Sequence, residues 1–240
     1  MIDTILFDLD GTLLPLDMQR FTEIYFKEMG NMFKDMMDPK LLVKYIWTAT
    51  EEMVENTEYK TNEEVFMNKF QQLIGGDISK YQKRFDDFYD TLYHKTRESV
   101  QSQALIKESI KLLKEKNYKL VVATNPLFPR KAIYHRIEWA GLDLKDFAYI
   151  TSYEDNHYCK PQLHYYKEIL EVIGKRPEQC MMVGNDVQED LVALKLGLKT
   201  FLIRNHMIHR TQDEIDSTYE GVYEDFYNFV KGMDAVSASS

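Results

Sequence analysis

The feature that most constrains the fold is a repeated alternation of strand-like and helix-like segments along the second half of the chain. Short apolar, β-branched runs predict strands at 118–124, 147–152, 180–185 and 199–204. Segments whose apolar residues recur every three or four positions predict helices at 104–117, 130–141, 164–174 and 189–197. Repeated βα units of this kind predict a parallel sheet with helices on both faces.

The N-terminal run DTILFDL (3–9) is a further strand of the same type and belongs to this sheet. Between it and the rest lies a stretch of different character. Apolar residues recur there at helical spacing, with short turns between them, in the segments 20–33, 41–54, 62–75 and 83–95. We therefore predict a small helical bundle inserted after the first strand. The expected boundaries are 1–15 and 97–240 for the α/β core and 16–96 for the helical insertion.

Composition narrows the class of protein. The 240 residues carry a formal net charge of −9, which argues against a general nucleic-acid binder or a protein that binds acidic membranes. The N-terminus lacks the pattern of a signal peptide, and no apolar stretch is long enough to span a bilayer. We interpret Cys159 and Cys180 as reduced thiols of a cytoplasmic protein. Disorder is expected only at the C-terminal AVSASS (235–240).

The stretch ILFDLDGTL (5–13) places Asp8 and Asp10 two residues apart, directly after an apolar run. An Asp-Gly pair between apolar stretches is a signal for a hairpin turn. That interpretation leaves Asp8 unexplained at the end of an apolar strand. The alternative, which we favour, is a nucleophile and an acid/base that share a cation.

Polar residues also follow the other predicted strands. In open α/β sheets, ligands bind outside the carboxyl ends of the strands, so side chains at those ends should converge. The residues concerned are Asp8, Asp10, Thr124, Asn125, Lys160, Asn185, Asp186 and Asp190. Several carboxylates, one hydroxyl and one ammonium at a single point form a chemically coherent set.

These residues resemble the motifs of the haloacid dehalogenase superfamily of phosphatases and phosphotransferases. The matching pieces are DLDGT (8–12), VVATN (121–125), CKP (159–161) and VGNDVQED (183–190). They occur in the order of the family and cover the α/β core. The resemblance implies a Rossmann-like core. The helical insertion is similar, by position and helicity, to the C1-type cap domain of the family.

The resemblance implies a role for each motif residue. Asp8 would attack phosphorus and form an aspartyl-phosphate, while Asp10 would act as general acid and base. Mg²⁺ would bind the Asp8 carboxylate, the Asp10 carbonyl oxygen and an acid of the fourth motif, relieving the repulsion between acids and phosphate. Gly11, Thr124, the Asn125 N–H and Lys160 would hold the phosphoryl group, Lys160 supplying positive charge.

The fourth motif, GNDVQED, departs from the family pattern, in which an acid follows the glycine directly. Asn185 occupies that position here, and Asp186 comes next. We favour Asp186 as the metal ligand and Asp190 as an anchor for Lys160 or for water on the metal. Asn185 is the alternative ligand, and Asn or Asp here is also suited to cap the following helix.

The predicted function is that of a Mg²⁺-dependent phosphatase that hydrolyses a small phosphorylated metabolite, with no nucleic-acid or membrane partner. One alternative is a phosphomutase, which uses the same four motifs and returns the phosphoryl group to a sugar phosphate. Another is a non-catalytic phosphate-binding protein of the same fold, which only Asn185 favours. The oligomeric state is not predicted.

Overall fold

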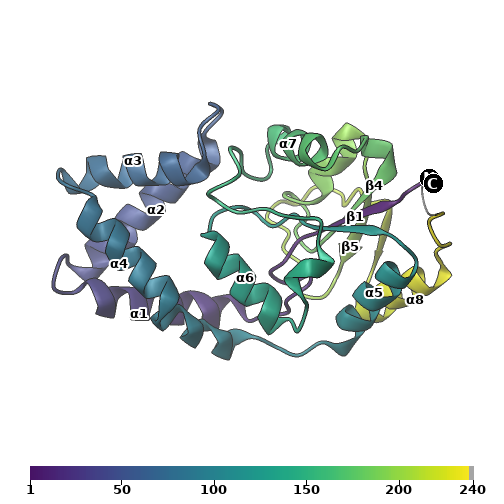
Figure 1. The fold of residues 1–240 in the computed structure, drawn as a ribbon, viewed down its shortest axis with the longest axis horizontal. Coiled ribbons are helices and arrows are strands. Elements are labelled where there is room, and N and C mark those ends of the chain that lie inside the picture. The colour runs from purple at the N-terminus through teal and green to yellow at the C-terminus, as the bar shows by residue number, and fades with distance from the viewer. Residues whose placement is uncertain (238–240) are drawn as a thin grey trace.

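The computed structural model describes residues 1–237, and its centre is a six-stranded sheet (Figure 1). The strands lie in the order β3-β2-β1-β4-β5-β6, and each neighbouring pair is parallel. They are β1 (Thr4–Phe7), β2 (Lys119–Val122), β3 (Tyr149–Ile150), β4 (Cys180–Gly184), β5 (Lys199–Ile203) and β6 (Tyr219–Gly221). The central position of β1 brings the first motif between the second and the fourth.

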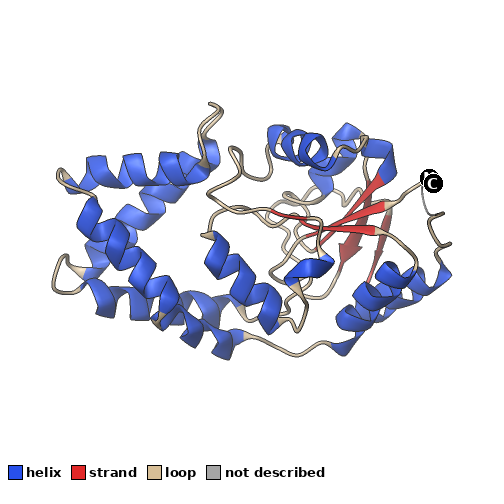
Figure 2. Cartoon of the chain, in the orientation of Figure 1, coloured by secondary structure: helices blue, strands red, loops and turns tan. Residues whose placement is uncertain are grey.

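Helices flank the sheet and also form a separate bundle at the other end of the molecule (Figure 2). The bundle contains α1 (Met18–Phe33), α2 (Pro39–Glu55), α3 (Asn62–Ile74) and α4 (Ser79–Asp90), followed by the 3₁₀ helix η1 (Leu92–Ser99). The other helices are α5 (Ala104–Glu115), α6 (Arg130–Trp139), α7 (Leu163–Ile173) and α8 (Tyr223–Gly232), with 3₁₀ helices η2 (Leu144–Asp146), η3 (Pro177–Gln179) and η4 (Leu191–Leu196). The predicted fold class, a Rossmann-like parallel sheet with an inserted helical bundle, is confirmed.

Both faces of the sheet are buried, which explains why its strands are continuous apolar runs. Ile5 and Phe7 of β1 pack in one cluster with residues of α5, α6 and α8. Leu6 points to the opposite face, where it belongs to a cluster with Tyr165 and Ile169 of α7. The alternation along β1 thus anchors the strand in two cores and fixes the direction in which Asp8 leaves it.

The structure differs from the predicted elements in three places. The predicted helix 83–95 is interrupted at Thr91, whose backbone is not helical and whose hydroxyl donates to the Asp87 carbonyl. Within the predicted helix 189–197 the structure has only the 3₁₀ helix η4 (Leu191–Leu196), which follows a turn in which the Asp190 carboxylate accepts from the Asp186 N–H. β6 and α8 were not predicted, and β6 exposes two of its three side chains and so lacks an apolar run.

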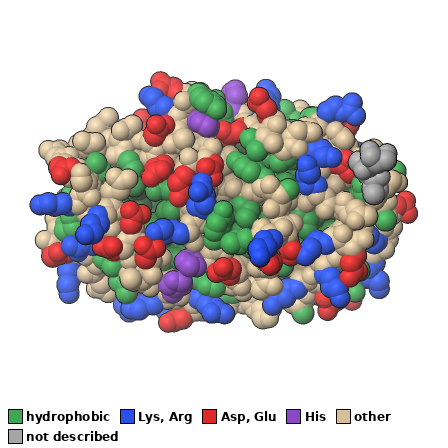
Figure 3. Space-filling view, viewed as in Figure 1, with side chains coloured by type: hydrophobic (Ala, Val, Ile, Leu, Met, Phe, Trp, Pro, Cys, Tyr) green, Lys and Arg blue, Asp and Glu red, His purple; other side chains and the backbone are tan. Residues whose placement is uncertain are grey.

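The C-terminal segment is ordered further than expected. The Val236 N–H donates to the Lys116 carbonyl at 2.8 Å, so part of AVSASS is held against the core. Its last three residues lie outside the described residues. On the face seen in Figure 3, acidic and basic side chains are interspersed. Within residues 1–237, no helix combines the length and the apolar character needed to cross a membrane.

Candidate active site

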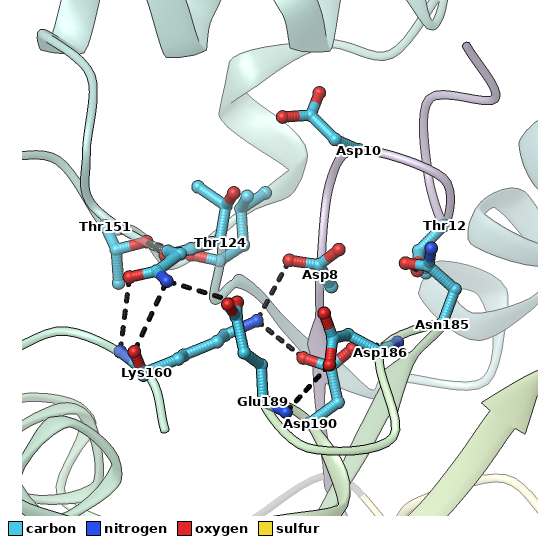
Figure 4. A network of polar contacts seen from close by, with 12 residues as sticks. Asp8, Asp10, Thr12, Thr124, Thr151, Lys160, Asn185, Asp186, Glu189 and Asp190 are labelled. Atoms are coloured by element: carbon cyan, nitrogen blue, oxygen red, sulfur yellow. Dashed lines mark hydrogen bonds and ion pairs between the residues drawn. The ribbon is translucent and has the colours of Figure 1, made fainter. Parts of the chain in front are cut away.

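Lys160, in the loop between β3 and α7, is the centre of a polar cluster beside the end of β1 (Figure 4). Its Nζ atom donates to Asp8 Oδ1 at 2.9 Å and to Asp190 Oδ1 at 2.6 Å, and its side chain is fully buried. Burial alone lowers the pKa of a lysine, but the Asp190 and Asp8 carboxylates raise the pKa of Lys160 well above 10.5. The ammonium group is therefore charged at neutral pH.

The loop after β2 holds the Lys160 loop in position. Asn125 Oδ1 accepts from the Lys160 N–H at 3.2 Å, and Asn125 Nδ2 donates to Glu189 Oε2 at 3.1 Å. The carbonyl of Thr124 accepts from the Thr151 hydroxyl at 2.7 Å. These bonds tie β2, β3 and β4 together at their carboxyl ends, and they leave the Thr124 side chain at the wall of the cavity above Asp8.

Asp186 follows β4 and is held from two sides. Its Oδ1 accepts from the backbone N–H groups of Gln188 and Glu189, both at 3.0 Å, so the residue caps the following turn as expected. Arg210 Nη1 lies 2.7 Å from Asp186 Oδ2. Half of the Arg210 side chain is exposed, whereas only 7% of the Asp186 side chain is. The Asp186 carboxylate thus faces the cavity, and its ion pair with Arg210 is open to water on the arginine side.

Both polar atoms of the Asn185 amide are hydrogen-bonded. Its Oδ1 accepts from the Thr12 hydroxyl at 2.9 Å, and its Nδ2 donates to the His206 carbonyl at 2.7 Å. Gly11, with a positive φ of 84°, passes so close that a Cβ atom would collide with the Asn185 amide. The Gly11 carbonyl in turn accepts from the Tyr223 hydroxyl at 2.9 Å. Asn185 and Gly11 therefore form a packing contact that joins the turn after β1 to the end of β4.

Asp10 extends away from the Lys160 cluster, as Figure 4 shows, and its Oδ2 pairs with the guanidinium of Arg136 from α6. Arg136 is almost completely buried, and its guanidinium carbon lies 4.5 Å from the ring centre of Phe128. Burial raises the pKa of Asp10 above 3.8, although Arg136 opposes that shift. In residues 1–237, Asp10 Oδ1 and Arg136 Nη2 are buried without a hydrogen-bond partner.

Most of the predicted residues surround one cavity of about 280 Å³ between the sheet and the helical bundle. Those that line it are Asp8, Asp10, Thr124, Asn125, Asn185 and Asp186. Lys160 and Asp190 stand behind Asp8 and bond to it or to each other, so they belong to the same cluster. Gly11 is not among the residues that line the cavity.

Three charged residues of this site were missed by the sequence analysis: Arg136, Glu189 and Arg210. Glu189 lies within the fourth motif, so its position in the sequence could have suggested it. Arg136 and Arg210 lie outside the motifs, and nothing in their spacing separates them from surface arginines. Arg130, on the same helix as Arg136, pairs with Asp155 in a half-exposed contact.

The oxygen donors at the floor of the cavity suit a magnesium ion. Asp8 and Asp186 present carboxylate oxygens to the cavity, and oxygen is the ligand that Mg²⁺ prefers. Among residues 1–237 there is no group of three or more His, Cys, Asp or Glu side chains that could enclose a metal ion. Two carboxylates suit Mg²⁺ nevertheless, because this ion usually keeps several waters and binds one or two carboxylates together with a substrate phosphate.

The fold and the site define a Rossmann-like α/β protein whose acids gather around a buried lysine at the carboxyl ends of parallel strands. A family model described as a haloacid dehalogenase-like hydrolase matches residues 2–197. This chain belongs to that family of hydrolases.

Several known proteins are similar to it. Pyrophosphatase PpaX of Bacillus cereus (strain B4264) is 23% identical over 199 residues, which cover 83% of this chain and 82% of that protein. A HAD phosphatase from Thermococcus onnurineus superposes with a TM-score of 0.59 at 18% identity, over 98% of this chain and 100% of the other. The HAD hydrolase YfnB of Bacillus subtilis, solved with bound magnesium, gives a TM-score of 0.58 at 22% identity, over 95% and 98%. These superpositions support the fold.

Proposed function

We propose that this chain is a Mg²⁺-dependent phosphatase that hydrolyses a small phosphorylated metabolite through an aspartyl-phosphate on Asp8. The observation that carries the proposal is the contact of 2.9 Å between Asp8 Oδ1 and the buried Lys160 ammonium, at the floor of a cavity. The lysine orients the carboxylate that would act as the nucleophile. It also supplies positive charge where phosphoryl oxygens would lie.

The balance of charge supports a cation at this site. Five acids gather here, namely Asp8, Asp10, Asp186, Glu189 and Asp190, against the three basic groups of Lys160, Arg136 and Arg210. A phosphate dianion would be repelled by such a set. Asp8, Asp186 and the Asp10 carbonyl would hold Mg²⁺, which when bound neutralises phosphoryl oxygens and orients the ester for in-line attack.

The proposed chemistry needs two half-reactions. In the first, an Asp8 carboxylate oxygen forms a bond to phosphorus while the bond from phosphorus to the ester oxygen breaks. Asp10 gives its proton to the departing alkoxide. In the second, Asp10 takes a proton from a water molecule, whose oxygen attacks phosphorus and releases inorganic phosphate and the Asp8 carboxylate. Thr124 and the Asn125 N–H hold the phosphoryl oxygens throughout, while the Lys160 ammonium behind Asp8 supplies positive charge.

We further propose that residues 16–96 act as a cap domain over a core of 1–15 and 97–240. The aromatic side chains that α1 contributes to the cavity support this assignment, because they would exclude bulk water from the reacting phosphate. We place the protein in the cytoplasm, and the unpaired, buried state of Cys159 and Cys180 supports a reducing compartment.

The test is the release of inorganic phosphate from p-nitrophenyl phosphate with magnesium chloride and after its removal with a chelator. We expect magnesium-dependent turnover that falls by roughly a thousandfold or more in Asp8→Asn, because the nucleophile is lost. Asp213→Asn removes an equal charge from an exposed position and should retain full activity. Circular dichroism should be the same for all three proteins. Undiminished turnover in Asp8→Asn would remove Asp8 as the nucleophile.

Incubation with a sugar phosphate, together with a binding measurement, separates the two alternatives. A phosphomutase incubated with a sugar phosphate would yield an isomer and little free phosphate. A non-catalytic phosphate-binding protein would release no phosphate from any ester, although it would still bind a phosphate analogue.

A further inference from the structure

The cavity above Asp8 has two chemically different parts. Its floor is the polar cluster at the ends of the strands, whereas its walls are apolar and carry nine aromatic side chains. Representative wall residues are Phe21, Phe26, Trp47, Phe66, Phe85 and Phe128. The floor is where the phosphoryl group would be held, so the walls enclose the rest of a bound ester.

The helical bundle contributes no charged side chain to the lining of this cavity. Within the described chain, the one basic residue that lines it is Arg210, which lies at the floor and pairs with Asp186 and Glu189. A leaving group that carried a carboxylate or a second phosphate would therefore meet no cation near the walls. Burying such an anion without a partner is strongly unfavourable.

Three of the wall hydroxyls already have hydrogen-bond partners within the bundle. The hydroxyls of Tyr25 and Tyr89 are 2.8 Å apart and form a buried hydrogen bond. The Thr22 hydroxyl donates to the Met18 carbonyl of its own helix at 2.8 Å. A polyhydroxylated sugar would bring several hydroxyls into this space, and most would lose their hydrogen bonds to water without replacement.

One aromatic side chain of the wall is exposed enough to pack against the ring of a ligand. Trp47 on α2 is 51% exposed, although it is the largest type of apolar side chain. Its ring centre lies 5.7 Å from that of Phe26, at the cavity wall. The two rings are tilted by 43°, and a flat ligand ring that stacks on Trp47 or meets it edge to face would gain a favourable contact beyond the area that it buries.

From these observations we infer that the leaving group of the substrate is an uncharged aromatic alcohol, so that the substrate class is the monophosphate esters of such alcohols. This inference rests on the proposed phosphatase function. The size agrees, because a buried apolar cavity of about 150 Å³ is known to hold one benzene ring. The cavity here, of about 280 Å³, has room for a ring with a short linker.

The test compares esters whose leaving alcohols have similar basicity, so that intrinsic reactivity does not decide the result. The probes are 2-phenylethyl phosphate, 2-hydroxyethyl phosphate and phosphoglycolate, of which the last carries a charged leaving group. We expect kcat/KM for the phenylethyl ester to exceed the values for the others by about tenfold or more, because burial of a phenyl ring favours the transition state by at least that factor.

Variants locate the effect on the wall. Trp47→Ala should lower kcat/KM for 2-phenylethyl phosphate by about tenfold, since it removes the stacking surface. Tyr59→Ala removes another exposed aromatic side chain of the same bundle, which does not line the cavity. This variant should leave kcat/KM for 2-phenylethyl phosphate unchanged. Thr22→Lys adds a cation to the wall and should raise the relative rate for phosphoglycolate.

The possible results distinguish this inference from the proposed function. If all the esters are hydrolysed but phosphoglycolate or 2-hydroxyethyl phosphate is as good a substrate as the phenylethyl ester, the inference is wrong and the phosphatase function stands. If no ester releases phosphate, the proposed phosphatase function is wrong. The preference for an aromatic group is then tested by the binding of phosphonates, which are not hydrolysed. Calorimetry with 2-phenylethylphosphonate and 2-hydroxyethylphosphonate should give about tenfold tighter binding of the first, and equal affinities would overturn the inference.

Discussion

At the scale of single residues, the pairing of Asp10 with Arg136 is the least expected feature of the site. An acid that must first give and then take a proton works best when its pKa is near the working pH. Burial raises the pKa of Asp10, and the opposing effect of Arg136 limits how far it rises. Arg136 also orients the Asp10 carboxylate, because the guanidinium that pairs with it is held against the ring of Phe128.

The first prediction concerns the proposed acid role. Asp10→Asn should slow hydrolysis of an alkyl phosphate by on the order of 10²- to 10⁴-fold, because the departing alkoxide no longer receives a proton. p-Nitrophenyl phosphate, whose leaving group needs no proton, should be slowed much less in the first step. Release of the alcohol or of p-nitrophenol in the first turnover is the measurement, because the second half-reaction also uses Asp10 and is common to both esters. Equal slowing of the two would contradict an acid role for Asp10.

The second prediction concerns the buried pair. Arg136→Met should lower the free energy of unfolding at pH 7 by about 3 kcal/mol, since it leaves the Asp10 carboxylate buried without its counter-charge. The double variant Arg136→Met/Asp10→Asn removes both charges and should recover most of that loss. Urea unfolding of the wild type, both single variants and the double variant gives the coupling energy. A double variant less stable than Arg136→Met would contradict the pairing.

The same variant should show a defined pH dependence. Without Arg136 the folded-state pKa of Asp10 rises further above its ordinary value of 3.8, so the folded protein binds this proton more tightly than the unfolded chain does. Stability is then lost as the pH rises above 3.8 towards the folded-state pKa. The difference between Arg136→Met and wild type should therefore be smaller at pH 4 than at pH 7.

At the scale of elements, the ends of β1 and β4 are packed too closely to vary. A Cβ atom on Gly184, the last residue of β4, would overlap the carboxylate of Asp190. Asp190 is the second partner of Lys160, so the backbone of β4 and the ammonium group are positioned together. The close approach explains why a residue without a side chain ends this strand.

The third prediction follows from this contact. Gly184→Ala should lower stability by roughly 1–3 kcal/mol through overpacking. It should also lower phosphatase turnover, because Asp190 and with it Lys160 are displaced. Gly232→Ala is the matched control, since nothing lies within 4 Å of a Cβ atom there. Thermal unfolding and phosphate release measure the two effects, and an active, stable Gly184→Ala would contradict the packing.

At the scale of the whole molecule, the helical bundle contacts the α/β core on two sides of the cavity. Phe21 and Tyr25 of α1 meet Phe128, with ring centres at 6.0 and 5.7 Å. On the other side, the Asn62 N–H of α3 donates to the Asn156 carbonyl at 2.9 Å. The cavity is therefore enclosed by parts of the chain that are distant in sequence, and a ligand within it contacts both.

The fourth prediction concerns metal binding by the folded state. Mg²⁺ at a hundred times its dissociation constant should stabilise the protein by about 2.7 kcal/mol. For a chain of this size that corresponds to a rise in Tm of roughly 5–10 °C. Asp186→Asn should lose most of this rise, whereas Asp213→Asn, an equal charge change at an exposed position, should keep it. Sodium chloride of equal ionic strength controls for screening, and an equal rise with it would contradict a specific site.

The sequence by itself determined the α/β class, the position of the inserted helices and the gathering of Asp8, Lys160 and Asp186 at one point. The reason is that period-2 and period-3.6 patterns are local, and parallel connections force successive strand ends to the same edge of the sheet. The role of Gly11 in holding the phosphoryl group stays a prediction, whereas its close approach to Asn185 became visible only in the tertiary structure.

Only the tertiary structure decided which other residues join the site and what surrounds it. Arg130 and Arg136 stand on the same short helix, and whether such a side chain is buried depends on how that helix lies against the β1 turn. The aromatic residues of the bundle likewise share one helical spacing whether they fill a core or line a cavity. Periodicity reports the face of a helix, while burial and charge pairing depend on contacts between elements far apart in the chain.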